Sequence, residues 1–441
     1  MPTSLTDLEA RYRCASPRSR ALFEQGRSYT AGAAKGAYYY PPYPLTMARG
    51  QGCYLWDVDR RRYVDCANHH TAQVLGHGNE RVEAAVREQM QKGIALGAPI
   101  GIESEIARAM CDRVDALERI RFVNSGTEAT LHAIRLARGY TQRGKIAKFE
   151  GGYHGSHDAV EVSVAPSLDQ AGPPDAPIAL PTAGGMSPSA ASEAVILPYS
   201  DPEAVERLVA EHASELACVL FDPKAGILDI QPDFARAVRD ITRRHGVLLI
   251  FDEIVGFRTA TGGLQGLYGI DPDLSCFGKI VGGGFPVGAF GGRADLMDLF
   301  DNSQQSTGLF QSGTFSAHPV AMAAGLATLS ELTPQTIDHL NALGTRLKDQ
   351  LNALFAERAI AAQAVCTGSV FSIYFARGPI ANYRALAATD KTLIQPLFLS
   401  LIEQGYFLGP GLGMCALSAP MDAGHIDGLV AAVGNALAEI A

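Results

Sequence analysis

Between about residues 75 and 325, amphipathic stretches with helical period alternate with short, almost wholly apolar runs. The helical stretches include NERVEAAVREQM and PDFARAVRDITRRHG, and the apolar runs include ACVLF and VLLIFDE. His245 and Gly246 predict a helix end just before a strand at 247–251. Apolar strands that alternate with helices are typical of a parallel sheet covered on both faces. This part of the chain is therefore expected to form one large α/β domain.

The two ends of the chain follow a different pattern. Residues 1–30 predict one amphipathic helix, and residues 53–66 predict two short strands around a charged turn. Further elements are expected later in the chain: helices at 334–357, 391–404 and 424–440, and a strand near 369–376. We expect both ends to form one smaller α+β domain. The predicted division is an N-terminal segment of that domain at 1–50, the large domain at 51–326, and the C-terminal part at 327–441.

Residues 166–192 interrupt the alternation of helix and strand. They hold six prolines among Gly, Ala and Ser, which predicts a long irregular loop. Loops of this length inside a compact domain are usually functional or disordered.

Composition narrows the classes of function. The 441 residues carry 37 Lys and Arg against 46 Asp and Glu, a net charge of −9, which disfavours a nucleic-acid partner because binding to phosphates needs clustered cations. No apolar run reaches the roughly 18 residues of a membrane span, and the N-terminus lacks the apolar core of a signal peptide. Eight cysteines stand singly, without a Cys-x-x-Cys pair. We therefore expect a cytoplasmic protein with reduced thiols and no membrane partner.

The segment 122–129, FVNSGTEA, predicts a strand that runs into a helix through Ser125, Gly126 and Thr127. Two hydroxyls and free backbone N–H groups at a helix start can bind an anion, phosphate above all. The alternative is an ordinary Ser/Thr helix cap, which this motif alone favours.

The segment 150–158, EGGYHGSHD, places Tyr153 between glycines. Glycines let the backbone approach a ligand, and the tyrosine presents a flat ring for stacking. A half-buried turn tyrosine is the alternative. The spacing of His154, His157 and Asp158 is similar to that of metal ligands, but no matching His or Cys group stands elsewhere, so no metal is expected.

Asp252 and Lys279 follow apolar runs. Asp252 comes after LLIF, where α/β sheets bind their ligands, and a buried carboxylate there needs a partner such as a protonated pyridine nitrogen. A helix-capping aspartate is an equal alternative.

Lys279 stands alone in LSCFGKIVGGGFP, surroundings that lower the pKa of a lysine and suit it to Schiff-base formation, although a structural lysine explains the position as well. The glycines there fit neither a P-loop nor a dinucleotide-binding motif.

In this order along the chain, the four features together suit pyridoxal phosphate. The helix start takes the phosphate, the aromatic side chain covers the ring and the aspartate keeps the ring nitrogen protonated. The lysine, 27 residues after the aspartate, forms the Schiff base and moves the proton. Chance agreement of four independent features is a poor explanation.

The sequence resembles the class III pyridoxal-phosphate aminotransferases of fold type I, in particular the branch of glutamate-1-semialdehyde aminomutases and β-amino-acid aminotransferases. The motifs that carry the resemblance are YLWDVD, FVNSGTEA, RLARGYTQRGKIAKFEGGYHG, LLIFDEIVGFR, GKIVGGGFPVGAFGGR and GTFSAHPVAMAAG. It is strong over about residues 45–330 and weaker at both ends. It implies a large domain with a mostly parallel central sheet and a smaller α+β domain.

The resemblance also implies roles for single residues. Lys279 and Asp252 are the expected catalytic residues, the first as the Schiff-base lysine and the second as the partner of the pyridine nitrogen. The further cofactor contacts that it implies are Ser125, Gly126 and Thr127 at the phosphate, Tyr153 and Ile254 on the two ring faces, His154, and Thr314. Because the family's threonine at Thr314 reaches the phosphate of a neighbouring subunit, the resemblance implies a homodimer with shared active sites.

The chain departs from the family at positions that bear on the substrate. Asp222 stands where the family usually has Glu, and Lys35 stands where related enzymes have an arginine for the substrate carboxylate. Leu412 lies in the C-terminal loop, where β-amino-acid aminotransferases tend to carry an arginine. Trp56 of the YLWDVD motif is the fourth candidate substrate residue. We expect a bulkier or less charged ketone or amine rather than a standard amino acid held by two arginines.

The expected activity is amino transfer from an amine donor to a ketone or aldehyde acceptor, through Lys279 and a pyridoxamine phosphate stage. An alternative is an aminomutase of the glutamate-1-semialdehyde type, which moves the amino group within one molecule, with loop 166–192 as a lid. A cofactor-binding protein without catalysis is a third interpretation, which the combination of Lys279, Asp252 and Tyr153 argues against.

Overall fold

The computed structural model describes residues 2–32, 38–301, 303 and 308–440. The chain divides into two compact units. Unit 1 comprises Met1–Asn79, Asp338–Gly378 and Ala388–Ala441, and unit 2 comprises Glu80–Ile337 and Pro379–Ala387. The boundaries between the units thus fall at Asn79 and Ile337, whereas the sequence suggested residues 50 and 326. In addition, the short segment Pro379–Ala387 belongs to unit 2.

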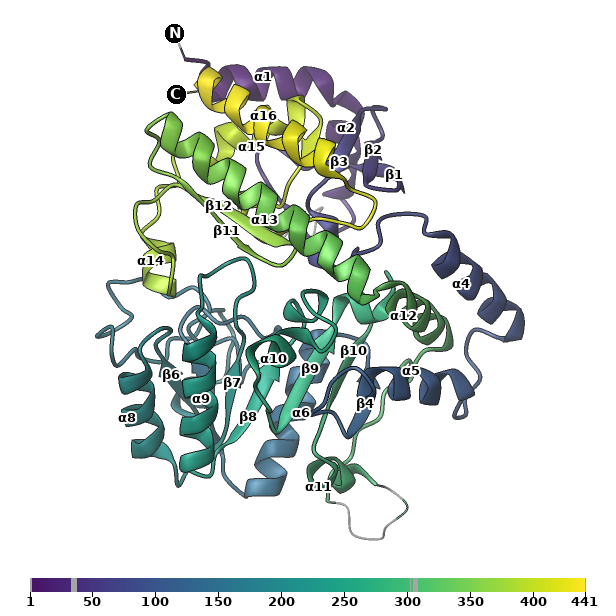
Figure 1. The fold of residues 1–441 in the computed structure, drawn as a ribbon, viewed down its shortest axis with the longest axis vertical. Helices are drawn as coiled ribbons and strands as arrows, with labels where there is room; N and C mark the ends of the chain where they lie inside the picture. The colour runs from purple at the N-terminus through teal and green to yellow at the C-terminus, as the bar shows by residue number, and fades with distance from the viewer. Residues whose placement is uncertain (1, 33–37, 302, 304–307, 441) are drawn as a thin grey trace. The chain divides into compact units, whose positions relative to one another are not determined.

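The core of unit 2 is a sheet to which seven described strands contribute (Figure 1). In chain order they are β4 (Arg119–Val123), β5 (Lys145–Phe149), β6 (Ala194–Leu197), β7 (Leu216–Phe221), β8 (Leu248–Asp252), β9 (Leu274–Gly278) and β10 (Gly288–Gly292). Their order across the sheet is β4-β10-β9-β8-β7-β5-β6. Strands β5 to β9 pair in parallel, while β10 runs antiparallel to β4 and β9. The predicted α/β class with a mostly parallel central sheet is confirmed.

Helices cover both faces of this sheet. The described helices of unit 2 are α4 (Glu80–Lys92), α5 (Gly101–Cys111), α6 (Gly126–Thr141), α7 (Pro188–Ser192), α8 (Pro202–His212), α9 (Pro232–Arg244), α10 (Gly263–Tyr268), α11 (Ala294–Met297), α12 (Pro319–Glu331) and α14 (Tyr383–Ala387). Helix α6 lies on one face, and α8 and α9 lie on the other (Figure 1). The alternation along β7 explains this: Cys218 and Leu220 join the cluster beneath α6, whereas the Phe221 ring meets Phe234 of α9 at a centroid distance of 6.2 Å.

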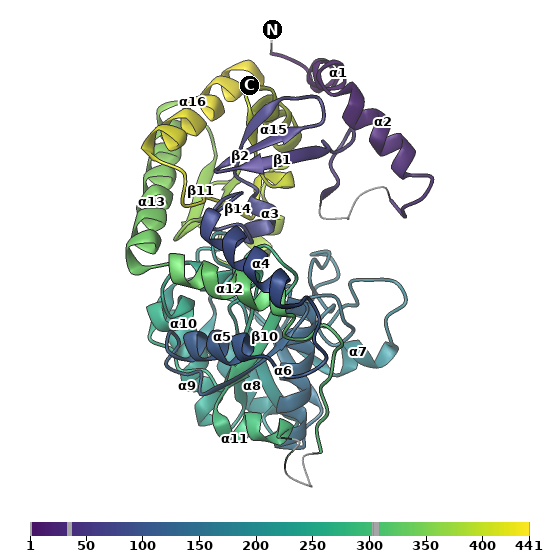
Figure 2. The same ribbon diagram turned by 90° about the vertical axis from the view of Figure 1, so that its right-hand side faces the viewer.

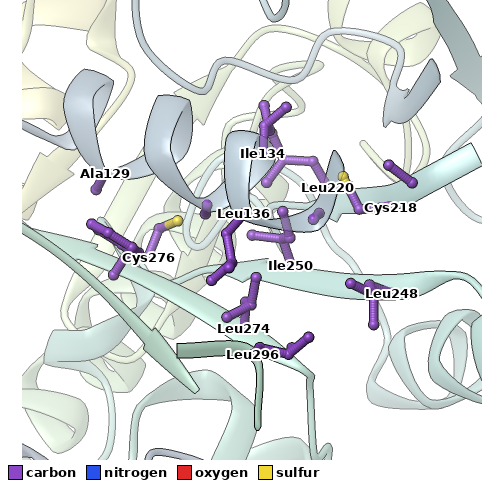
Figure 3. Packing of buried hydrophobic residues seen from close by; sticks show 14 of the residues in the cluster. Ala129, Ile134, Leu136, Cys218, Leu220, Leu248, Ile250, Leu274, Cys276 and Leu296 are labelled. Carbon is purple, nitrogen blue, oxygen red and sulfur yellow. The ribbon is translucent and has the colours of Figure 1, made fainter. Parts of the chain in front are cut away.

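The packing between α6 and the sheet fixes where this helix begins. Ile134 and Leu136 of α6 belong to one cluster with Leu220, Ile250 and Leu274 from three strands (Figure 3). Each of these side chains is at most 2% exposed. Burial of one such side chain stabilises the fold by about 1.5–3 kcal/mol. The start of α6 is therefore held firmly at the edge where the parallel strands end.

Unit 1 combines both ends of the chain. Its described helices are α1 (Leu5–Ala15), α2 (Pro17–Gly26), α3 (Asn68–Thr71), most of α13 (Pro334–Glu357), α15 (Ile394–Glu403) and α16 (Ala423–Ile440). One sheet holds β1 (Met47–Gln51), β2 (Tyr54–Asp57), β3 (Arg62–Asp65) and β13 (Tyr406–Phe407), and another holds β11 (Gln363–Thr367), β12 (Val370–Tyr374) and β14 (Cys415–Ala416). Because β13 pairs with β3, the strands that follow residue 47 belong with the C-terminal part of the chain.

The helix expected over residues 1–30 is wrong as a single element. The chain forms two helices there, and Pro17 occupies the first position of the second. A proline inside a continuous helix would lack an N–H donor and collide with the preceding turn. The strands expected within 53–66 and the helices expected in the last part of the chain are confirmed, with small shifts at their ends. None of the described helices combines the length and apolar character needed to cross a membrane.

Residues 166–192 form the expected long loop, which ends in the short helix α7. Figure 2 shows α7 at the margin of unit 2, and α4 packed along α12. Backbone contacts hold the middle of the loop: Pro181 forms an isolated bridge with Val162, which precedes the loop, and the Ile178 N–H donates to the Ala171 carbonyl at 2.9 Å.

Gly325→Ala is expected to lower the free energy of unfolding by about 1–3 kcal/mol, because it overpacks a close contact. Gly325 lies in α12 against the 3-10 helix η3 (Lys279–Gly282), and a Cβ at residue 325 would lie 2.0 Å from the carbonyl oxygen of Val281. Urea denaturation measures the difference. Gly101→Ala at the start of α5 is the control, since a Cβ there meets nothing within 4 Å. Equal effects of both substitutions would contradict this packing.

Candidate active site

Three strands of unit 2 end at one edge of the sheet, and each leads to a predicted site residue. β4 leads to Ser125, β8 ends at Asp252, and β9 is followed by Lys279. Gly288 of β10 pairs with the last residue of β4 on one side and of β9 on the other. A Cβ on Gly288 would lie 2.0 Å from the Ser125 carbonyl oxygen. Glycine at this position therefore lets the chain that follows β4 pass close to β10.

The first turn of α6 offers backbone donors to a ligand. Ser125 is the N-cap, and its hydroxyl accepts a hydrogen bond from the Glu128 N–H at 3.2 Å. The N–H groups of Gly126 and Thr127 have no acceptor within the helix, because they lie in its first turn. Ile254 packs against this start: a Cβ on Gly126 would lie 2.6 Å from Ile254 Cδ1. These residues together form a helix end suited to an anion.

The glycine-flanked turn that carries Tyr153 is seated on α6. The Thr130 hydroxyl donates to the His154 carbonyl at 2.6 Å. Gly155 has φ +100°, and a Cβ there would lie 2.6 Å from Thr127 Oγ1, so this position needs glycine. Tyr153 is 54% exposed, which leaves its ring open to a ligand.

Asp252 is the buried acid of the site. Its Oδ2 lies 2.8 Å from His154 Nδ1, and its Oδ1 accepts the Ile254 N–H at 3.1 Å. Burial raises the pKa of Asp252 to about 6, while the hydrogen bond from Ile254 and the charge of Lys279 oppose that rise. Burial, helped by the charge of Lys148, holds the pKa of His154 well below its usual value. His154 is therefore neutral, and its Nδ1–H donates to the carboxylate.

Lys279 has an unusual backbone and a reactive amine. It begins η3 with φ 51°, in the left-handed region that non-glycine residues rarely occupy. Such backbone strain clusters at functional sites. Burial lowers the pKa of Lys279 to about 8, against the opposing charges of Asp252 and Asp222. A fraction of its amine is therefore neutral and nucleophilic near neutral pH.

Two further buried lysines lie near these groups and were not predicted. Lys224 Nζ lies 3.3 Å from Asp222 Oδ2, and both side chains are almost fully buried. Lys148 of β5 is fully buried, and its amine donates to the carbonyls of Gly152 at 2.8 Å and Val162 at 2.5 Å. Burial lowers the pKa of Lys148 to about 7. A lysine inside an apolar run just before a glycine turn was the signal that could have revealed Lys148.

The other predicted residues are not part of this cluster. Thr314 is exposed in the turn before α12. Trp56 of β2 and Leu412 of the 3-10 helix η5 (Pro410–Leu412) belong to unit 1, where Leu412 is fully buried. Lys35 lies outside the described residues. Within the described ranges, no three His, Cys, Asp or Glu side chains form a group suited to a metal ion.

Comparison with known proteins identifies the family. Residues 36–400 match the model of the family Aminotransferase class-III. The chain belongs to the class III aminotransferases. It is similar to glutamate-1-semialdehyde 2,1-aminomutase 2 of Geobacillus kaustophilus, with 38% identity over 371 residues, 83% of this chain and 84% of that protein. It is similar to the β-phenylalanine transaminase of Variovorax paradoxus, with 38% identity over 437 residues, 98% of this chain and 95% of that protein. A solved ω-transaminase from Sphaerobacter thermophilus has a TM-score of 0.92 and 38% identity, covering 96% of this chain and 97% of that one.

This class III aminotransferase has fold type I and depends on pyridoxal phosphate, as predicted. Its substrates are an amine donor and a carbonyl acceptor. The sheet edge of unit 2 fits the cofactor. The phosphate needs backbone donors, which the start of α6 offers. The pyridine nitrogen needs a carboxylate, and Asp252 keeps free lone pairs besides its two hydrogen bonds. The aldehyde needs an amine, such as that of Lys279.

Proposed function

We propose that the sheet edge described above is the active site and that Lys279 is its central catalytic residue. Bound pyridoxal phosphate supplies a carbonyl group that takes up amines and a ring that accepts electrons from the neighbouring carbon. The observation that carries the proposal is that Asp252 and Lys279 stand at the ends of adjacent parallel strands, with burial lowering the pKa of Lys279 to about 8. A neutral Nζ of this kind can bind a carbonyl carbon and can also accept and return a proton.

Asp252 and His154 are proposed to hold a proton at the ring nitrogen. A positively charged partner favours the anionic carboxylate and so opposes the burial that raises the pKa of Asp252 to about 6. Neutral His154 donates to Oδ2 and fixes the plane of the carboxylate. The remaining proposed contacts are Ser125, Gly126 and Thr127 with the phosphate, and Tyr153 and Ile254 with the two ring faces.

An aminomutase is the second candidate, favoured by the similarity to the Geobacillus kaustophilus enzyme. It would retain an intermediate, and loop 166–192 is the candidate lid. The second half of this loop is held to the chain that precedes it, however: the Ser163 N–H donates to the Leu180 carbonyl at 2.7 Å, and the Val164 N–H donates to Thr182 Oγ1 at 3.1 Å. We therefore propose transfer between two molecules as the main activity.

We further propose that the substrate is less charged than a standard amino acid. The residues proposed to shape its site are Lys35, Trp56, Asp222 and Leu412, the last from a buried position. The aliphatic side chain of Leu412 cannot bind a carboxylate, and the Asp222 carboxylate is already paired with Lys224 at 3.3 Å. Both observations favour a substrate recognised largely by apolar contact.

One experiment tests activity and substrate class together. Protein loaded with pyridoxal phosphate is mixed with single amine donors, without an acceptor, and the keto product is measured per protein. Glutamate, alanine and aryl-alkyl amines form the panel. We expect the aryl-alkyl amines, which lack a carboxylate, to release about one keto product per protein chain, and Lys279→Ala to slow this step at least about 10³-fold, because the proton carrier is lost. Lys92→Ala, on the exposed face of α4, is the control.

Two outcomes would contradict this account. An unchanged rate in Lys279→Ala would remove that lysine from the mechanism. Isomerisation of an amino-carbonyl compound, with no keto product released from any single amine, would favour the aminomutase.

We also propose a homodimer in the cytoplasm. Thr314 is exposed, and two neighbouring aromatic side chains are unusually open, Phe310 at 72% and Phe315 at 58%. Exposed apolar groups close together are typical of an interface. All eight cysteines are free, which supports a reducing compartment.

The expected mass in light scattering is twice that of the 46.8 kDa chain. Phe315→Asp should shift the protein toward the monomer, because it places a charge in the interface. Leu267→Asp, at a 60% exposed position on α10, should not. A wild-type mass of one chain would refute the dimer.

A further inference from the structure

A C-terminal segment contributes an arginine to unit 2. Residues Pro379–Ala387 belong to this unit and contain α14. The Arg384 guanidinium donates to both carboxylate oxygens of Glu150, each at 3.0 Å. The Glu150 side chain is 5% exposed and that of Arg384 20%. This is a bidentate ion pair that is largely withdrawn from water, the geometry in which arginine binds a carboxylate most strongly.

The same guanidinium also holds the long proline-rich loop. It donates to three successive backbone carbonyls, those of Ala171 at 3.3 Å, Gly172 at 2.9 Å and Pro173 at 3.2 Å. The neighbouring Tyr383 hydroxyl donates to the Pro166 carbonyl at 2.8 Å. Lysine could not make these contacts together, because it lacks the planar fork of donors. A single side chain, Arg384, therefore connects the loop 166–192 to Glu150.

Glu150 leads directly into the turn that carries Tyr153 and His154. The Tyr383 ring lies over the start of this turn: Gly151 has φ +77°, and a Cβ there would lie 2.5 Å from Tyr383 Cδ2. The side of the turn nearer the sheet is fixed by Lys148, which donates to a carbonyl of the turn. The turn is thus held on one side by Lys148 of the sheet and on the other by Tyr383 of α14.

We propose that Arg384 is a positioning residue of the cofactor site, which acts through Glu150 on the turn that presents Tyr153 and His154. The inference rests on the proposed function, in which Tyr153 covers the ring and His154 orients Asp252. Without Arg384, the Glu150 carboxylate is left buried without its cation, and the turn relaxes toward water. Cofactor binding then weakens, although Arg384 itself does not touch the cofactor.

The test uses the apoprotein and its affinity for pyridoxal phosphate, measured by titration, beside thermal unfolding. We expect Arg384→Gln to raise the Kd at least about tenfold and to shift the absorption maximum of the bound cofactor. Glu150→Gln should do the same. The double variant should bind the cofactor no more weakly than either single variant, because both substitutions break the same ion pair. Arg384→Lys, which keeps the charge without the fork, serves as the milder variant if Arg384→Gln does not fold.

The matched control is Arg239→Gln. Arg239 forms a more deeply buried pair with Asp273, at 2.7 Å, and Arg293 and the Leu249 N–H donate to the same carboxylate. This pair therefore lies at the beginnings of β8 and β9, whereas Asp252 and Lys279 lie at their ends. The control substitution should lower the unfolding temperature and leave the Kd for pyridoxal phosphate within about twofold of the wild-type value, because distant sites are energetically independent.

The outcomes separate the inference from the function on which it rests. The Arg384 and Glu150 variants could unfold at a lower temperature, as the control does, and still keep the wild-type Kd and absorption maximum. In that case Arg384 is only structural and the inference is wrong. If the losses of binding free energy caused by the two single substitutions add up in the double variant, Arg384 does not act through Glu150, and that part of the inference is wrong. If wild-type apoprotein does not take up pyridoxal phosphate, the proposed function itself fails.

Discussion

The parallel pairing of β8 with β9 places a carboxylate, Asp252, and an amine, Lys279, at neighbouring strand ends, and the rest of the site is arranged around this pair. Either charge alone would be costly to bury. Burial pushes both groups toward neutrality, raising the pKa of Asp252 to about 6 and lowering that of Lys279 to about 8, while each group's charge opposes the shift of the other. The apolar cluster beneath α6 holds the strands, and with them this pair, in place.

The balance of charge around this pair explains why an anionic cofactor fits. Besides Lys279, the buried amines of Lys148 and Lys224 lie close by, and only Lys224 has a carboxylate partner among the described hydrogen bonds and ion pairs, Asp222. His154 stays neutral, because burial and Lys148 hold its pKa far down. Burial lowers the pKa of Lys148 to about 7 and that of Lys279 to about 8, so both amines are partly neutral, and the dipole at the start of α6 is what favours an anion. A phosphate group gains from this dipole and from the free backbone N–H groups there, and a neutral ligand would gain less.

Much of this arrangement was predictable because its signals are local in the sequence. A glycine-flanked tyrosine, an aspartate after an apolar run and a lysine before glycines each show their chemistry within a few residues. The antiparallel β10 was not predicted, since its glycine-rich sequence has no strand propensity and pairs only because glycine fits between β4 and β9. Arg384 was not predicted either, because it is 234 residues from Glu150 and only the fold brings the two together.

The most direct test of the account is to find which lysine the cofactor joins. The loaded protein is reduced with borohydride and digested, and the peptide that carries the cofactor is identified by mass spectrometry. Our account predicts that the label lies on Lys279 alone. A label on Lys148 or Lys224, the other buried amines of the region, would contradict the assignment on which the proposed mechanism depends.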